Sequence, residues 1–142
     1  MKRIVLRNNV EIKEILKLHQ KYNIGVNIEN FNNPYYLEDN PNAINETLEK
    51  YKNIGIYSIH GPFMDLCFGS IDKLIMEVTE KRFEYAYEVS CKLLCRNIIL
   101  HNGYNPKTLY CPKDWVKRSK IFWENFLLNK NKDTIFYYRE YF

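Results

Sequence analysis

The stretch Ile54-Gly-Ile-Tyr-Ser-Ile-His60, followed by Gly-Pro-Phe, decides the fold of this chain. It is a short apolar run that ends on a histidine, and Asn97-Ile-Ile-Leu-His101 repeats the pattern before Asn-Gly-Tyr. Short apolar runs between turn signals are typical of buried strands in a parallel sheet. Because parallel α/β folds place their chemistry at the carboxyl ends of strands, both histidines are expected at one functional edge.

Strand-like and helix-like segments alternate along the whole chain. The predicted strands are 3–6, 24–28, 54–60, 97–100 and 134–138. The predicted helices are 10–21, 42–51, a long one after Ser70, and 114–129, and a polar loop is expected at 30–41. This (βα)4β order indicates an α/β fold with parallel strands in a single domain, 1–142. Such a series either curls toward a barrel or stays an open sheet, and a full barrel needs ~250 residues, so length alone favours the open sheet.

Two helix features are predicted in more detail. Asn9 is the expected cap of the first helix and Ser70 that of the long one. In the long helix, apolar residues recur every three to four positions and predict the face that packs on the core. These residues are Ile71, Ile75, Val78, Ala86, Val89 and Leu93.

Composition limits the class of protein. The chain is 46% hydrophobic, which excludes disorder, yet it has no apolar run long enough to span a membrane and no signal-peptide pattern. Its four cysteines form no C-x-x-C pair, so buried thiols in a reducing cytoplasm are expected. The net charge of +4 comes from scattered lysines, which do not favour a nucleic-acid partner.

Three linked blocks carry a family resemblance. They are Ser58-Ile-His-Gly-Pro-Phe-Met-Asp-Leu-Cys-Phe-Gly-Ser70, Val78-Thr-Glu-Lys-Arg-Phe83 and Ile98-Ile-Leu-His-Asn-Gly-Tyr104. In this order and spacing the chain resembles the xylose isomerase-like TIM-barrel superfamily, which holds sugar-phosphate isomerases, epimerases and endonuclease IV-type apurinic endonucleases. The resemblance covers the whole chain and implies a partial TIM (β/α) barrel, cut after its fifth strand to its N-terminal portion.

The resemblance also implies a divalent-metal cofactor, Zn, Mn or Mg. Histidines that match His60 and His101 are metal ligands in the nuclease-like members of the superfamily. Because further family ligands come from strands six to eight, we expect metal binding by this chain to be weak or absent.

Other site candidates lie at strand ends. The resemblance makes Glu140 the catalytic candidate, since a glutamate ends strand five in nucleases and epimerases alike. Glu29 ends the second strand and either contacts substrate or pairs with a neighbouring lysine. Tyr104 lies in a strand-end loop and either stacks on a sugar or packs within the loop. Asp65 either orients His60 or forms the turn that follows it.

The implied function is that of a sugar or sugar-phosphate isomerase or epimerase, which abstracts a proton next to a carbonyl with the help of a metal. We expect this chain to be inactive by itself. One alternative is an apurinic endonuclease-like phosphodiesterase. Another is a non-catalytic chain that self-associates through open strand edges. The expected partner is a small sugar or sugar phosphate, not a membrane.

Overall fold

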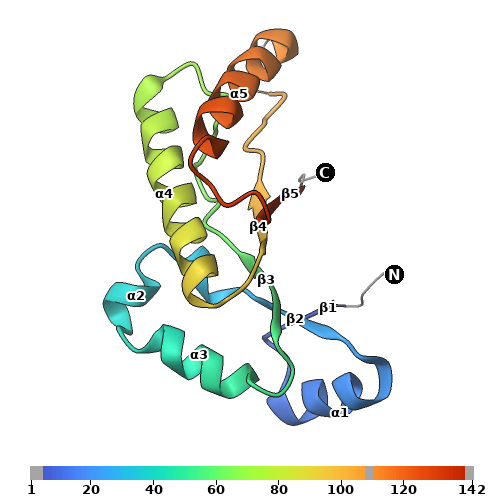
Figure 1. The fold of residues 1–142 in the computed structure, drawn as a ribbon. Coiled ribbons are helices and arrows are strands. Elements are labelled where there is room, and N and C mark those ends of the chain that lie inside the picture. The colour runs from blue at the N-terminus through green and yellow to red at the C-terminus, as the bar shows by residue number, and fades with distance from the viewer. Residues whose placement is uncertain (1–4, 108–110, 140–142) are drawn as a thin grey trace.

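The computed structural model describes residues 5–107 and 111–139, which form an α/β fold (Figure 1). Its strands are β1 (Val5–Arg7), β2 (Gly25–Ile28), β3 (Ile56–His60), β4 (Asn97–His101) and β5 (Ile135–Arg139). They form one sheet in the order β1-β2-β3-β4-β5, and every neighbouring pair is parallel. The predicted parallel (βα)4β arrangement is confirmed.

The strand order decides between the two architectures that the sequence left open. A doubly wound open sheet reverses the direction in which strands are added, whereas a barrel adds each strand beside the one before it. Here the order is consecutive throughout the described sheet. The sheet is therefore part of a barrel wall, and the expectation from length alone was wrong.

Four main helices cover one face of this wall. They are α1 (Ile12–Tyr22), α3 (Ala43–Tyr51), α4 (Lys73–Lys92) and α5 (Pro112–Leu127). Figure 1 shows them as an outer arc along one side of the sheet. The predicted loop at 30–41 contains two short turns of helix, η1 (Asn30–Asn32) and α2 (Tyr36–Asp39). Within the described ranges, no helix is both long and apolar enough to cross a membrane.

The hydrophobic core lies between the sheet and these helices. Ile28, Ile59 and Leu100 point from the strands into this layer and are fully buried. Phe83 of α4 meets Phe122 of α5 edge to face, with ring centroids 6.0 Å apart. Each fully buried side chain of this size contributes about 1.5–3 kcal/mol to folding. The outer layer therefore holds the sheet in place without help from its other face.

The long helix differs from the prediction at its start. Asp72 caps α4, since its carboxylate accepts a hydrogen bond from the backbone N–H of Leu74 (2.8 Å). Ser70 instead accepts one from the N–H of Asp72 (3.1 Å). The predicted cap of α1 was also wrong, because the N-cap position is Glu11 and not Asn9, and it makes no side-chain cap bond.

The predicted apolar stripe of α4 is confirmed only in its second half. Ala86, Val89 and Leu93 are buried, but Ile71 is 76% and Val78 48% exposed. In the first half, Thr79 takes the core-facing position, and its hydroxyl accepts the backbone N–H of Cys67 (3.0 Å). This hydrogen bond ties the loop after β3 to the helix.

Candidate functional site

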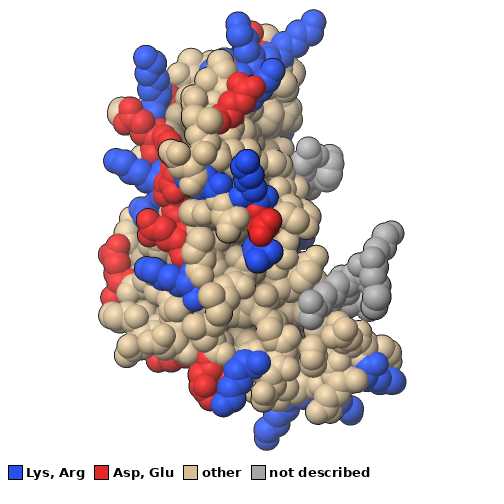
Figure 2. Space-filling view, viewed as in Figure 1, with Lys and Arg blue, Asp and Glu red and all other residues tan. Residues whose placement is uncertain are grey.

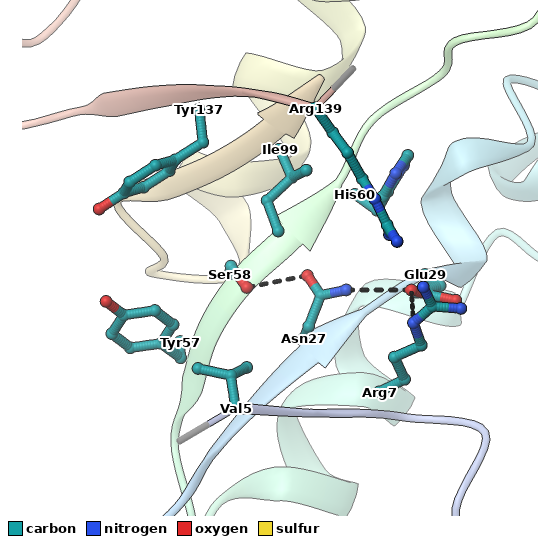
Figure 3. Close-up of a pocket in the computed structure, with 10 residues that line it drawn as sticks. All are labelled: Val5, Arg7, Asn27, Glu29, Tyr57, Ser58, His60, Ile99, Tyr137 and Arg139. Atoms are coloured by element: carbon teal, nitrogen blue, oxygen red, sulfur yellow. Dashed lines mark hydrogen bonds and ion pairs between the residues drawn. The ribbon is translucent and has the colours of Figure 1, made fainter. Parts of the chain in front are cut away.

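The sheet face opposite the helices carries a pocket of about 410 Å³ (Figure 3). We call it the sheet-face pocket. All five strands line it, and β4 contributes Ile99. Its polar lining residues are Arg7, Asn27, Glu29, Ser58, His60 and Arg139. Because successive strand residues point to opposite faces, the residues between these positions are the apolar ones that face the helices. The inner face of the strands carries these polar side chains together with the apolar Val5 and Ile99.

Two imidazoles meet at the inner end of β3 and β4. The Nε2 atoms of His60 and His101 lie 3.0 Å apart, and the side chains are buried, at 5% and 4% exposure of the whole residues. His60 Nδ1 lies 2.9 Å from the carbonyl oxygen of Gly61, so that nitrogen is the donor to the carbonyl. The Nε2 of neutral His60 is then an acceptor, and His101 donates its Nε2–H to it. The sequence prediction that the two histidines share one edge is confirmed.

Phe63 shields this histidine pair from water. Its ring centroid lies 5.3 Å from that of His60 and 4.7 Å from that of His101. Phe63 comes from the Gly-Pro-Phe turn directly after β3. The turn after β3 therefore covers His60, the last residue of that strand.

Burial lowers the pKa of both imidazoles. The pKa of His101 falls to about 4, because burial disfavours its charged form and because His60 and the guanidinium of Arg139 are close. The pKa of His60 also lies below its usual value, mainly through burial, while its hydrogen bond to Gly61 and the charge of Glu29 oppose the shift. Both rings are therefore neutral at neutral pH, which leaves the Nε2 of His60 free to accept the shared hydrogen bond.

A separate chain of polar contacts runs from β3 toward β1. The Ser58 hydroxyl donates to the Asn27 side-chain oxygen (2.8 Å), and the Asn27 amide donates to Glu29 (3.3 Å). The Nε of Arg7 lies 3.1 Å from the same Glu29 oxygen. Glu29 thus both lines the pocket and forms an ion pair, and its partner is an arginine instead of the expected lysine.

Arg139 closes the pocket from the β5 side. It is the last described residue of β5 and pairs in register with His101. In Figure 3 its side chain reaches from β5 toward His60. Arg139 is exposed, and no carboxylate of the described residues forms an ion pair with it. Sequence reasoning missed it, although a charged residue that follows an apolar strand-like run is a usable signal.

The remaining candidates lie elsewhere. Tyr104 packs its ring against Trp115 of α5, with centroids 5.1 Å apart, and does not line the sheet-face pocket. Its predicted role in binding substrate stays a prediction. Asp65 is exposed in the turn after β3 with φ of +59°, and the Nδ1 of His60 faces Gly61 instead. Glu140 lies outside the described residues.

The loops after β3 and β4 are locked together beside the histidines. Gly103 has φ of +65°, and a Cβ placed there would lie 2.1 Å from the carbonyl oxygen of Leu66. Only glycine permits both this backbone conformation and this approach. The loop packing keeps Phe63 and the histidine pair in fixed positions.

The histidine pair meets part of the requirement for a metal site. Two imidazole ligands of one tetrahedral zinc ion have nitrogens about 3.3 Å apart, which is close to the distance seen here. Catalytic zinc sites use three protein ligands, however. Among residues 5–107 and 111–139, no group of three or more His, Cys, Asp or Glu side chains is placed to hold a metal. The described residues therefore do not fit the implied metal, and Arg139, which pairs in register with His101, brings a cation to the same end of the sheet.

Comparisons with solved structures agree with this architecture. The TTHB071 protein of Thermus thermophilus, from a crystal soaked with ZnCl2, matches 89% of the chain at 20% identity and TM-score 0.58. A D-tagatose 3-epimerase-like protein matches 89% at 17% identity and TM-score 0.63. The 3-keto-D-glucoside 4-epimerase YcjR of E. coli matches 96% at 15% identity and TM-score 0.63.

This chain has the fold of a partial TIM barrel. It spans 48%, 48% and 56% of these three solved chains, which is about half of each. No protein-family model and no curated protein matches the sequence. At 15–20% identity the likeness establishes the fold of the partial barrel, and its chemistry has to be argued from its own residues.

Proposed function

We propose that this chain is a sugar isomerase- or epimerase-like partial barrel that binds a small sugar or sugar phosphate in the sheet-face pocket. The observation that carries the proposal is the convergence of polar side chains from neighbouring parallel strands on one pocket. Ligands of parallel α/β folds bind at this end of the strands.

The chemistry of the pocket suits a polyhydroxylated ligand. Ser58 and Asn27 offer a hydroxyl and an amide, which can both donate and accept hydrogen bonds. Ile99 and the ring of Tyr137 supply apolar wall beside them, as a sugar with polar edges and apolar ring faces needs. A volume of about 410 Å³ is within the range of small-molecule sites.

The similar structures support this class of ligand. One is titled a D-tagatose 3-epimerase-like protein and another a 3-keto-D-glucoside 4-epimerase. Both names belong to those proteins, and the chain covers about half of each. The two names are the reason to test ketoses and aldoses first.

We further propose that the chain by itself does not catalyse isomerisation or epimerisation of the sugar. Proton abstraction next to a carbonyl needs a free base and a group that stabilises the developing negative charge. The described carboxylate of the pocket, Glu29, is held by Arg7, and His60 and His101 are bound to each other. The group proposed as catalytic by resemblance, Glu140, lies outside the described residues.

Binding and turnover are tested in one set of experiments. Calorimetry with a panel of aldoses, ketoses and their monophosphates should detect binding that Ser58→Ala weakens. Deuterium exchange at the carbon next to the carbonyl, followed by NMR in D2O, should show no catalysed exchange. Metal-dependent exchange that His101→Ala abolishes would contradict the inactive assignment, and no binding by any sugar would contradict the proposed function itself.

Self-association is a second candidate, and one observation favours it. β5 lies at an edge of the described sheet, and its Ile135, Tyr137 and Tyr138 are each more than 40% exposed. An exposed apolar edge strand is a template for pairing with another chain. We propose that two copies pair through this edge, and sedimentation velocity at tens of micromolar should then show a dimer.

The apurinic endonuclease alternative has no such observation in its favour. Figure 2 shows Lys and Arg side chains interspersed with Asp and Glu over the face drawn, without a continuous basic surface there. The location of the chain remains our proposal as well. All four cysteines are free, which fits the reducing cytoplasm that we propose.

A further inference from the structure

The sheet-face pocket carries an excess of positive charge. Its charged lining residues are Arg7, Glu29 and Arg139. The charge of Glu29 is matched by Arg7, whose Nε lies 3.1 Å from the carboxylate. Arg139 has no carboxylate partner among the described residues. With both imidazoles neutral, one positive charge remains without a counterpart among residues 5–107 and 111–139.

The position of this charge is set by the sheet. Arg139 pairs in register with His101, and its side chain reaches across β4 toward His60 (Figure 3). From this position its charge helps to keep the pKa of both histidines below the usual value. Arg7 stands on the opposite side of the pocket, at the end of β1. The two guanidinium groups therefore enter the same pocket from the outermost strands of the described sheet.

We propose that Arg139, assisted by Arg7, binds an oxyanion of the ligand, so that the sheet-face pocket selects a sugar carrying a phosphate or carboxylate over a neutral sugar. This inference rests on the proposed function and specifies the chemical class of its ligand. Arg139 is a specificity-determining residue in this assignment. Its planar guanidinium can donate two parallel hydrogen bonds to two oxygens of one anion.

The neutral groups of the pocket fit the same ligand. The Nε of Arg7 contacts Glu29. A guanidinium has five N–H donors, so further N–H groups of Arg7 remain for an anion. The Phe63 ring covers the histidine pair, of which His60 lines the pocket. A cation at the same place would be repelled by Arg139, in agreement with the incomplete set of metal ligands among the described residues.

The test uses inorganic phosphate as the first probe. The chain is titrated with phosphate at constant ionic strength and pH 7, and the imidazole signals of His60 and His101 are followed by NMR. Arg139→Gln should weaken phosphate binding at least tenfold. Arg96→Gln is the matched control, because Arg96 is paired with Asp133 and does not line the pocket, and it should leave the affinity unchanged.

A second variant should act in the opposite direction. Glu29→Gln removes the one negative charge of the lining and frees the Nε of Arg7. Phosphate should then bind more tightly than it binds to the original chain. Phosphate that moves neither imidazole, or that binds equally well to Arg139→Gln, would overturn the inference.

A sugar arm separates this inference from the proposed function. Glucose, glucose 6-phosphate and gluconate are compared, and the anionic pair should bind at least tenfold more tightly than glucose unless Arg139 is replaced. Equal binding of all three overturns the inference and leaves the proposed function standing. Phosphate binding that requires Arg139, with no gain from any sugar, supports the oxyanion site but overturns its use for sugars and contradicts the proposed function. A preference for only one of the two anionic sugars supports the inference and identifies the group that is read.

Discussion

The Nε2 of His60 lies 3.0 Å from the Nε2 of His101, and the two imidazoles share one hydrogen bond in a buried setting. The carbonyl oxygen of Gly61 fixes the proton of His60 on Nδ1. Only His101 can therefore supply the proton between the rings. Protonation of either ring would place a positive charge in this buried setting, with Arg139 nearby, and so the pair resists protonation.

This resistance makes stability depend on pH. An unfolded histidine has a pKa near its usual value of about 6.5, whereas the pKa of folded His101 is about 4. As the pH falls through 6.5 the unfolded chain takes up protons that the folded chain does not. The unfolding free energy should therefore fall between pH 6.5 and pH 4, by up to about 3 kcal/mol, and should not change through these groups above pH 7.

Urea unfolding at several pH values measures this slope, and NMR titration gives the imidazole pKa values directly. His19→Gln is the control, because His19 lies on α1 and bonds to the Ile24 carbonyl, away from the pair. Its profile should match that of the original chain. Normal pKa values for both His60 and His101 would contradict the buried, coupled pair.

Zinc should bind weakly. The described residues offer two imidazoles, one short of the three protein ligands of catalytic zinc sites, and Arg139 repels a cation beside them. Calorimetry should give a dissociation constant weaker than micromolar, and Arg139→Gln should tighten it severalfold. A sub-micromolar zinc affinity that requires both His60 and His101 would refute this.

Gly103→Ala should destabilise the chain by about 3 kcal/mol or more, because it adds left-handed strain and a clash with the Leu66 carbonyl. Gly55→Ala is the matched comparison. Gly55 has φ of +78°, but a Cβ there meets nothing within 4 Å, so only the strain of about 1–2 kcal/mol is expected. Chemical denaturation of both variants gives the two values, and equal losses would contradict the locked loops.

Ile135→Lys should reduce self-association without unfolding the chain. Ile135 is 50% exposed on the edge strand β5, and a charge at an exposed edge opposes strand pairing. Ile121→Lys, at an equally exposed position on α5, is the control and should not alter the oligomeric state. Sedimentation velocity compares the three proteins. A monomeric original chain would remove the second candidate function.

The strand ends show how far the sequence can predict the site. Each apolar run that ends on a histidine places its side chain at the carboxyl edge of a parallel strand, so the meeting of His60 and His101 follows from pattern alone. Arg139 was missed because the family resemblance points to the neighbouring Glu140. The ion pair of Arg7 with Glu29 depends on β1 lying beside β2, which periodicity does not reveal.

Other features required three-dimensional context. Chain length suggested an open sheet, because the number of residues does not record the order in which strands are added. The start of α4 carries apolar residues on more than one face, and Thr79, bonded to the backbone of Cys67, takes the inward position there. Long-range contacts of this kind leave no local signal in the sequence.

The most direct test of the proposed sugar site is an NMR titration of the chain labelled at its histidines, of which there are three. Added sugar or sugar phosphate should move the signals of His60 and His101 in a saturable way and leave His19, outside the pocket, unchanged. His19 thus serves as a control within the same sample. Signals of His60 and His101 that stay still with every ligand, or that move no more than that of His19, would contradict a sugar site on the open face of the sheet.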